Sequence, residues 1–191
     1  MKKIFVRKVF PYDPTLNNRY SKYEGYLKIG RQTIDPGIIN SRIIDSSNVI
    51  DRVYCSPRKR AIESASLTGK EIIVLKELNE IVFDLSNLVS EEEYIKLGSN
   101  LVRERFINSF VDDTLMESRS EIKKRVESLI QKIKKLSDRE YLFISHSFFM
   151  KILETYLKTD DRLFEKPRLL EKYFDYKKKT YNFREGFEFN L

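Results

Sequence analysis

Residues 58–60 bring three cations to the point where a short apolar run changes to helical spacing. The apolar run ends at Cys55, and Ser56-Pro57 is predicted to open a helix whose first turn holds Arg60. Serine is a favoured helix N-cap, and proline suits the first helical position because its missing N–H would have had no partner there. A helix N-terminus with arginines around it favours an anion, above all phosphate. The alternative is that these cations only solvate the start of the helix.

Other side chains capable of chemistry stand directly after predicted strands. They are Arg7 and Lys8 after residues 4–6, Glu80 after residues 72–75, and His146 after residues 141–145. Open α/β sheets bind their ligands outside the carboxyl ends of the strands, where these side chains would meet Arg60. The pattern therefore predicts one pocket at one sheet edge. Each of these side chains could instead have a purely structural role, and this applies most clearly to His146, a lone histidine after a strand.

Apolar runs alternate with helical spacing along most of the chain. Strands are predicted over residues 4–6, 49–55, 72–75 and 141–145. Helices are predicted over 26–32, 35–44, 56–67, 122–136 and from 147 onward, and a helical stretch over 85–111 is broken near Gly98-Ser99. Aromatic residues over 174–189 alternate with charges, as in one or two solvent-facing strands. This order predicts an α/β fold with a three-layer, doubly wound, mainly parallel sheet and helices on both faces.

The length and composition indicate one globular domain. A chain of 191 residues with 41% hydrophobic residues is long enough and apolar enough for one full core. We therefore expect a single domain over residues 1–191. The broken helical stretch predicts a small helical insertion at about 85–118, placed over one end of the sheet.

The positive charge raises the question of nucleic acid. The net charge is +7, from 36 basic and 29 acidic residues, but the lysines are spread over most of the chain. No recognised nucleic-acid motif accompanies them, so a lysine-rich solvated surface is the preferred interpretation and a nucleic-acid partner is not expected. A basic interaction module that uses residues 177–179 stays open, and its binding would weaken steeply with salt.

Several classes of protein do not fit the sequence. The single cysteine, Cys55, allows no disulfide framework and fits a reducing cytoplasm. The apolar run at the N-terminus is too short for a signal peptide, and no run approaches the roughly 20 residues that cross a bilayer. One histidine and scattered carboxylates form no metal ligand set, so neither a metal nor a cofactor is expected. We expect a cytoplasmic monomer or homodimer without a membrane partner.

With these segments in place, the sequence resembles the histidine phosphatase superfamily, which contains the cofactor-dependent phosphoglycerate mutases. The most specific match is residues 54–65, which are close to the family's Ser-Pro-x-x-Arg-Ala-x-x-Thr-Ala signature. The other matches, in chain order, are residues 5–8 at its Arg-His-Gly, 27–32 at its Leu-Thr-x-x-Gly-x-x-Gln, 78–80 at its acid/base glutamate, 117–126 at its Gly-Glu-Ser…Arg-Val, and 144–147 at its second histidine motif, usually Ser-His-Gly.

The resemblance implies a phosphate pocket made by two arginines and two histidines. One histidine attacks phosphorus, the other stabilises the transferring group, and the glutamate protonates the leaving oxygen. On the matching positions, Arg7 and Arg60 would clamp the phosphate, His146 would be the second histidine, and Glu80 would be the acid/base.

The nucleophilic histidine of the family has no counterpart, because its position holds Lys8 and the following glycine is replaced by Val9. The chain's one histidine already matches the second motif. The segment after Glu80 also lacks the usual glycine. The ordinary phosphohistidine mechanism is therefore predicted to be absent.

Two functions remain for such a pocket. In the first, Arg7, Lys8, Arg60 and His146 bind a phosphorylated or carboxylated small molecule in an inactive or non-classical homologue. In the second, the same pocket is an enzyme with altered chemistry, with Lys8 as electrostatic catalyst or nucleophile and Glu80 or His146 moving protons.

Overall fold

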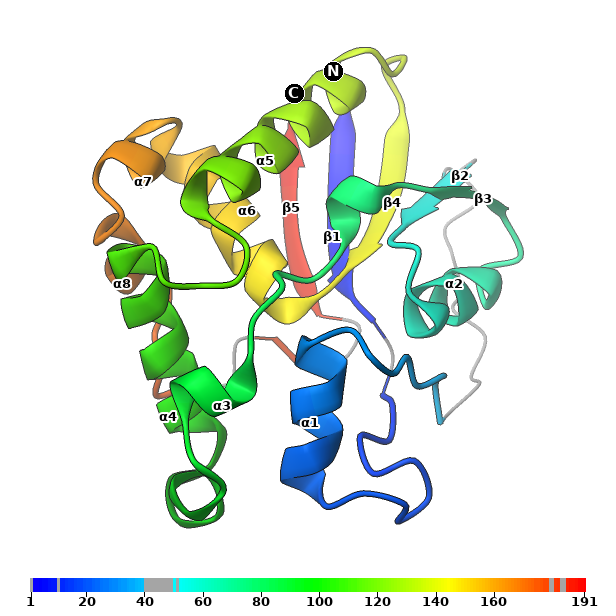
Figure 1. The fold of residues 1–191 in the computed structure, drawn as a ribbon. Helices are drawn as coiled ribbons and strands as arrows, with labels where there is room; N and C mark the ends of the chain where they lie inside the picture. Colours follow the sequence, from blue (N-terminus) through cyan, green and yellow to red (C-terminus); the bar gives the residue numbers. More distant parts are fainter. Residues whose placement is uncertain (1, 10, 40–49, 51, 179–180, 183–184) are drawn as a thin grey trace.

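The computed structural model describes residues 2–9, 11–39, 50, 52–178, 181–182 and 185–191. Five strands form one sheet in the order β3-β2-β4-β1-β5 (Figure 1). Their bounds are β1 Lys3–Lys8, β2 Arg52–Cys55, β3 Glu71–Val74, β4 Glu140–Ser145 and β5 Gly186–Asn190. The first four are mutually parallel and β5 pairs antiparallel with β1. The predicted α/β fold with a mainly parallel sheet is confirmed.

Helices connect the strands in the predicted alternation. The helices are α1 Lys22–Gly30, α2 Lys59–Ser66, the 3-10 turn η1 Lys76–Leu78, α3 Leu85–Leu88, α4 Glu91–Asp112, α5 Arg119–Lys134, α6 Ser147–Thr159, α7 Arg162–Glu165 and α8 Leu169–Tyr173. Helix α5 carries the predicted apolar stripe, whose members Ile122, Val126, Leu129, Ile130 and Ile133 are buried. The segment expected as an insertion contains α3 and α4.

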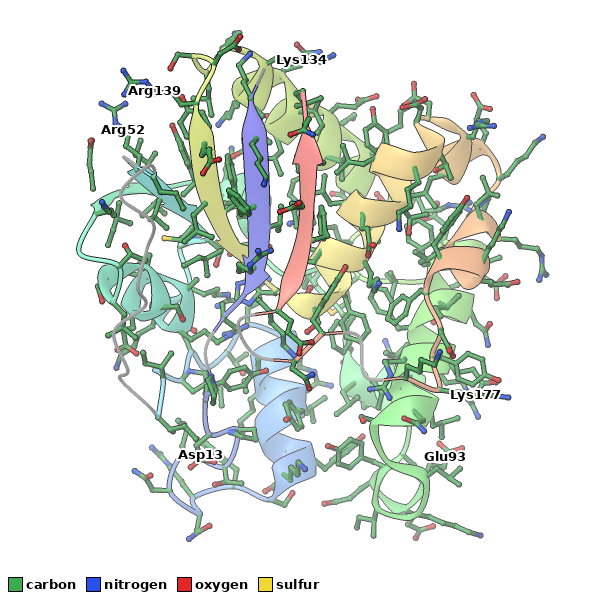
Figure 2. All side chains as sticks on the ribbon, turned by 180° about the vertical axis from the view of Figure 1, so that it is seen from behind. Asp13, Arg52, Glu93, Lys134, Arg139 and Lys177 are labelled. Atoms are coloured by element: carbon green, nitrogen blue, oxygen red, sulfur yellow. The ribbon has the colours of Figure 1, made fainter. Side chains whose placement is uncertain are left out.

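The two faces of the sheet have separate apolar cores. Ile4, Val6 and Phe143 contact the larger core, to which α4, α5 and α6 contribute. Leu142 and Ile144 belong to the smaller core on the other face, under α2. Figure 1 looks onto the side of α5 and α6, and Figure 2 shows β4, β1 and β5 from behind, in front of these helices. Helices thus cover both faces, as alternating side chains along buried strands require.

Serine and glutamate residues mark three helix starts. Reciprocal capping boxes join Ser21 to Glu24, Ser90 to Glu93 and Ser118 to Glu121, at α1, α4 and α5 respectively. Each box satisfies two N–H groups that the helix leaves without intrahelical partners. The predicted break in α4 is confirmed, because Gly98 has φ +67° and ψ −159° inside this helix.

Two predictions about helix starts were wrong. Residues 36–39 form no helix, whereas residues 40–44 of that prediction lie outside the described part of the chain. Ser56 is not the N-cap of α2, because the helix begins at Lys59 after the N-cap Arg58. Instead, the Asp35 carboxylate reaches across 24 positions and accepts the Lys59 backbone N–H at 2.7 Å. A tertiary contact therefore replaces the local cap that the sequence indicated.

The C-terminal tail contributes one strand, β5, at the edge of the sheet beside β1. Only one of the one or two expected strands forms within the described residues of 174–189. Cys55 is buried at the end of β2, between β3 and β4. Among the helices of the described ranges, none is long and apolar enough to cross a membrane.

Candidate anion-binding site

The carboxyl ends of β1, β2 and β4 bring most of the predicted side chains to one edge of the sheet. Lys8 pairs with Ser145, which precedes His146, and Cys55 pairs with Ile144, so Ser56 lies beside the end of β4. Because parallel strands end at the same edge, residues far apart in sequence become neighbours there.

Lys8, Arg60 and Glu80 line one cavity of about 990 Å³ at this edge. Its walls come from α1, from α4 and from the first turn of α6. Figure 1 shows α1 and α4 beyond the carboxyl ends of β1 and β4. The structure thus gathers three of the five predicted residues on one cavity, and it places Arg7 and His146 elsewhere.

Arg60 lies in the first turn of α2 with only 3% of its side chain exposed. One terminal nitrogen donates to Asp35 Oδ1 at 3.0 Å, and the guanidinium lies 4.9 Å from the centroid of the Tyr12 ring. Its Nε is buried and has no hydrogen-bond partner. Buried nitrogens without partners are rare, because leaving a charged donor unsatisfied costs more than a neutral one. Arg60 therefore retains a donor for a group that the protein itself does not supply.

Arg7 and Lys8 lie on opposite faces of β1, because successive side chains of a strand alternate. The Lys8 Nζ donates to the carbonyl oxygen of Tyr181 at 3.2 Å, and the side chain lines the cavity. Arg7 donates to the carbonyl oxygen of Phe187 in β5 at 3.2 Å and lies 5.5 Å from the Phe5 ring centroid. The Arg7 guanidinium thus contacts the edge strand, and Arg7 is not among the residues that line the cavity.

The Glu80 carboxylate lies against the start of α6. Oε1 accepts the Phe149 N–H at 2.8 Å and the Ile81 N–H at 3.1 Å, while Oε2 accepts the Phe148 N–H at 3.2 Å. Burial raises the pKa of Glu80 above its ordinary value, and the N–H donors and Arg60 offset that rise in part. The carboxyl group thus satisfies a helix start while it lines the cavity.

A buried ion pair fixes the loop that carries Glu80. Arg125 in α5 donates from two nitrogens to the two carboxylate oxygens of Glu117, each at 2.8 Å. Its third nitrogen donates to the carbonyl oxygen of Asn79 at 2.6 Å. The guanidinium also lies 4.5 Å from the Phe149 ring centroid. Arg125 therefore acts through the backbone that positions Glu80 rather than through the cavity.

His146 turns toward Ser56 rather than into the cavity. Its Nε2 lies 2.7 Å from Ser56 Oγ, and only 2% of the residue is exposed. Burial lowers the pKa of His146 well below 6.5, and the nearby Arg60 and Arg58 lower it further. The imidazole is therefore neutral at neutral pH, and its Nε2 is hydrogen-bonded to a hydroxyl.

Sequence reasoning missed three residues beside the site. Asp35 was read with Pro36 as a helix start, but its carboxylate pairs with Arg60. Tyr12 lies in the turn-rich loop after β1 and stacks under Arg60. Arg58 has a buried Nε without a partner, and burial lowers its pKa. No local pattern marks these residues, because each takes its role from a contact with a distant segment.

Acidic, histidine and cysteine side chains are common ligand groups of metal sites in proteins. Within the part of the chain that the structure describes, no group of three or more His, Cys, Asp or Glu side chains could hold a metal ion. The cations of Lys8 and Arg60 instead suit a phosphate or carboxylate group, which guanidinium and ammonium donors bind through charge-assisted hydrogen bonds.

The sequence model of the histidine phosphatase superfamily (branch 1) matches residues 45–171, about two thirds of the chain. The chain belongs to this superfamily. The matched region includes Arg60, Glu80 and His146, whereas Arg7 and Lys8 precede it. No curated protein sequence matches the chain.

Solved structures share this fold at low sequence identity. The alpha-ribazole phosphatase of Shigella flexneri is 18% identical, with a TM-score of 0.51 over 81% of this chain and 79% of that one. An Escherichia coli K-12 protein assigned as an alpha-ribazole-5'-P phosphatase is 16% identical, with a TM-score of 0.53 over 82% and 80%. Phosphoglycerate mutase of Bacillus anthracis is 16% identical, with a TM-score of 0.50 over 84% and 80%. At such identities the similarity shows the fold alone.

Proposed function

We propose that this superfamily member binds the phosphate or carboxylate group of a small molecule in the cavity, without a phosphohistidine intermediate. The buried Arg60 carries the proposal, because its Nε faces no partner and its side chain lines the cavity. Lys8 adds a second cation to the lining of the same cavity. Two cations in a partly desolvated site attract an anion more strongly than they would in water.

The lack of phosphohistidine chemistry rests on the chain's single histidine. The family mechanism needs two imidazoles, and the only one in the chain is His146. Its Nε2 already contacts Ser56 and the residue is almost wholly buried. By the resemblance of residues 5–8 to the family's Arg-His-Gly segment, Lys8 would take the position of the attacking imidazole. This combination supports a protein that keeps the anion site and lacks the covalent step.

An enzyme with altered chemistry is the second candidate, and one observation favours it. Lys8 and Glu80 line the same cavity, so an ammonium and a buried carboxyl group could both face a bound ester. Loss of a purified activity in Lys8→Ala would support this candidate, and full activity in that variant would remove it.

Phosphate binding tests the first candidate directly. We expect inorganic phosphate to bind by isothermal titration calorimetry and to raise the melting temperature. Arg60→Ala should abolish both effects, and Arg60→Lys should weaken them because lysine lacks the planar fork of donors. The matched control is Arg168→Ala, since Arg168 is exposed, pairs with Glu171 and does not line the cavity. Phosphate binding that survives Arg60→Ala unchanged would overturn the proposal.

An activity panel separates the two candidates. Phosphomonoesters are offered to the wild type and to Lys8→His. If the wild type shows no phosphatase activity and Lys8→His does, the phosphatase pocket lacks only its nucleophile. Turnover in the wild type that Lys8→His slows would mean that Lys8 belongs to a different mechanism.

A further inference from the structure

Aromatic side chains form the walls of the cavity beyond its cations. Tyr23 and Tyr26 come from α1, and Tyr94 comes from α4. Phe83 and Phe148 lie on the wall beside Glu80, with Phe148 in the first turn of α6. These rings line the same cavity as Lys8 and Arg60, and Lys22, Arg103 and Lys177 line it as well.

The tyrosine wall spans the two helices. The Tyr94 ring centroid lies 5.8 Å from that of Tyr23 and 6.3 Å from that of Tyr26, both in tilted or edge-on contact. The Tyr23 hydroxyl donates to the carbonyl oxygen of Val89 at 2.9 Å. These contacts fix the rings before any ligand arrives, which lowers the entropic cost of binding.

The phenylalanine wall is also held by packing. Phe83 and Phe148 meet edge to face at 5.3 Å, and Phe106 stacks on Phe148 at 4.0 Å from the buried side. Phe106 is fully buried in the larger core. A flat group that enters the cavity would therefore meet rigid ring faces and edges rather than mobile chains.

Two tyrosines of the cavity lining carry hydroxyls without a hydrogen-bond partner among the described residues. Across the described ranges, no hydrogen bond is formed by the hydroxyl of Tyr26 or that of Tyr94. Burial raises the pKa of Tyr26, and it raises the pKa of Tyr94 to about 12. Both hydroxyls are therefore protonated at neutral pH, and they can donate to ring nitrogens or oxygens or accept from them.

The cavity is much larger than a phosphate group needs. Its volume of about 990 Å³ lies at the upper end of the range of about 300–1,000 Å³ that is typical of small-molecule sites. The geometry points to a phosphate monoester whose organic part is a flat aromatic or heteroaromatic group. The phosphate lies at Arg60 and Lys8, and the ring system lies between the tyrosine and phenylalanine walls. This inference rests on the proposed phosphate site and specifies what the rest of the ligand is.

A series of four phosphates tests the ring requirement by calorimetry. The probes are inorganic phosphate, cyclohexyl phosphate, phenyl phosphate and 1-naphthyl phosphate. We expect phenyl phosphate to bind about two- to tenfold more tightly than cyclohexyl phosphate, which has a similar size but no π system. We expect 1-naphthyl phosphate to bind more tightly still.

Two variants place the effect on the tyrosine wall. Tyr94→Leu keeps an apolar helix-forming side chain and should remove most of the preference for phenyl over cyclohexyl phosphate. The matched control is Tyr20→Leu, because Tyr20 packs against Lys28 and Arg19 and does not line the cavity. The control should keep the full preference.

The outcomes separate this inference from the proposed function. Equal affinity for all four phosphates, abolished by Arg60→Ala, would leave the phosphate site standing and overturn the aromatic ligand class. No binding of any phosphate would remove the proposed function. A preference for phenyl phosphate that persists in Tyr94→Leu and in Tyr26→Leu would also overturn the assignment of the ring to these walls.

Discussion

Side chains at the cavity differ in how much of their bonding the protein already uses. Glu80 accepts three backbone N–H groups, and Lys8 donates to a carbonyl oxygen. Arg60 has one carboxylate contact and keeps a buried Nε without a partner. The unfilled bonding capacity is therefore concentrated on Arg60, and a ligand anion would satisfy it.

His146 predicts a pH dependence of stability that one variant isolates. Burial lowers its folded-state pKa well below 6.5, so the unfolded chain takes up a proton near pH 6.5 that the folded protein does not. The contribution of the neutral His146 to the free energy of unfolding is present above about pH 6.5 and is lost as the pH falls further. Between about pH 7.5 and 5.5 we expect the free energy of unfolding to fall by about 1 kcal/mol.

Urea denaturation of the wild type and of His146→Gln measures this effect. The variant lacks the titrating imidazole, so the difference between the two proteins removes the contributions of Glu80 and other carboxyl groups. Parallel pH profiles for the two proteins would contradict the lowered pKa.

Asp35 competes with any incoming anion for Arg60. Its carboxylate contacts a terminal nitrogen of Arg60 and the Lys59 N–H. We expect Asp35→Asn to bind inorganic phosphate about two- to fivefold more tightly, as measured by calorimetry, because the competing charge is gone. Asp84→Asn is the control, since Asp84 pairs with Arg31. Weaker phosphate binding in Asp35→Asn would instead mean that Asp35 orders Arg60 for its ligand.

The sequence predicted the positions of these residues better than the directions of their side chains. Lys8, Arg60 and Glu80 follow strands or open a helix, and such positions converge at one sheet edge in a parallel fold. Arg7 and His146 share that edge, but strand alternation puts Arg7 on the face of β1 opposite to Lys8, where it contacts the β5 backbone. His146 turns to Ser56, which lies 90 positions away in the sequence. Side-chain direction depends on partners that are distant in sequence, so the motif alone could not reveal it.

At the scale of the element, α4 depends on the backbone of one glycine. Gly98 has φ +67° and ψ −159°, a region that is essentially restricted to glycine. A Cβ built there meets nothing within 4 Å, so the cost of a side chain is backbone strain alone. We expect Gly98→Ala to lower the free energy of unfolding by about 1–3 kcal/mol, as measured by urea denaturation.

The neighbouring exposed residue Lys96 provides the control for Gly98→Ala. Lys96→Ala should change stability by no more than about 0.5 kcal/mol. A Gly98→Ala protein as stable as this control would mean that α4 straightens without cost. Since residues near the break, such as Tyr94, line the cavity, the same variant should also change ligand affinity.

Local signals predicted some elements and missed others. Helix α5 was predictable because its apolar residues follow a 3.6-residue period and its first turn has a capping box. The break in α4 was predictable from Gly98. The start of α2 was not, because Asp35 supplies from a distance the acceptor that Ser56 was expected to supply locally. Tertiary contacts override cap signals when a stronger partner lies nearby.

At the scale of the whole molecule, positive charge is distributed rather than gathered. Figure 2 shows Arg52, Arg139 and Lys134 at one end of the molecule and Lys177 near α4 at the other. With a net charge of +7 we expect weak, non-specific binding of a single-stranded oligonucleotide. Fluorescence anisotropy should show that this binding weakens about 10²–10³-fold between about 50 and 200 mM salt.

Arg60→Ala distinguishes this surface binding from the cavity. The variant should leave oligonucleotide binding nearly unchanged, because one buried arginine contributes little to a dispersed surface field. Loss of oligonucleotide binding in Arg60→Ala would instead identify the cavity as a nucleic-acid site. Inorganic phosphate at a concentration that fills the cavity should likewise leave oligonucleotide binding to the surface nearly unchanged.

The overall architecture was the most predictable level of the molecule. Alternating strands and helices allow few arrangements, because parallel crossovers are right-handed and each sheet face must be covered. The strand order and the antiparallel β5 at the edge could not be derived in the same way. They depend on which neighbours the tail meets, and the alternating aromatics of the tail only indicate a strand.

Cys55 gives this architecture a built-in kinetic probe. It is the only thiol of the chain, and burial raises its pKa to about 11, so the folded protein is almost inert to disulfide reagents near neutral pH. A reagent can reach Cys55 only after β2 separates from β3 or β4. The labelling rate therefore reports how often the sheet opens at Cys55, the residue before Ser56. An anion that binds at the carboxyl ends of the strands and stabilises them would slow the labelling of Cys55. A ligand that binds elsewhere would leave the labelling rate unaltered.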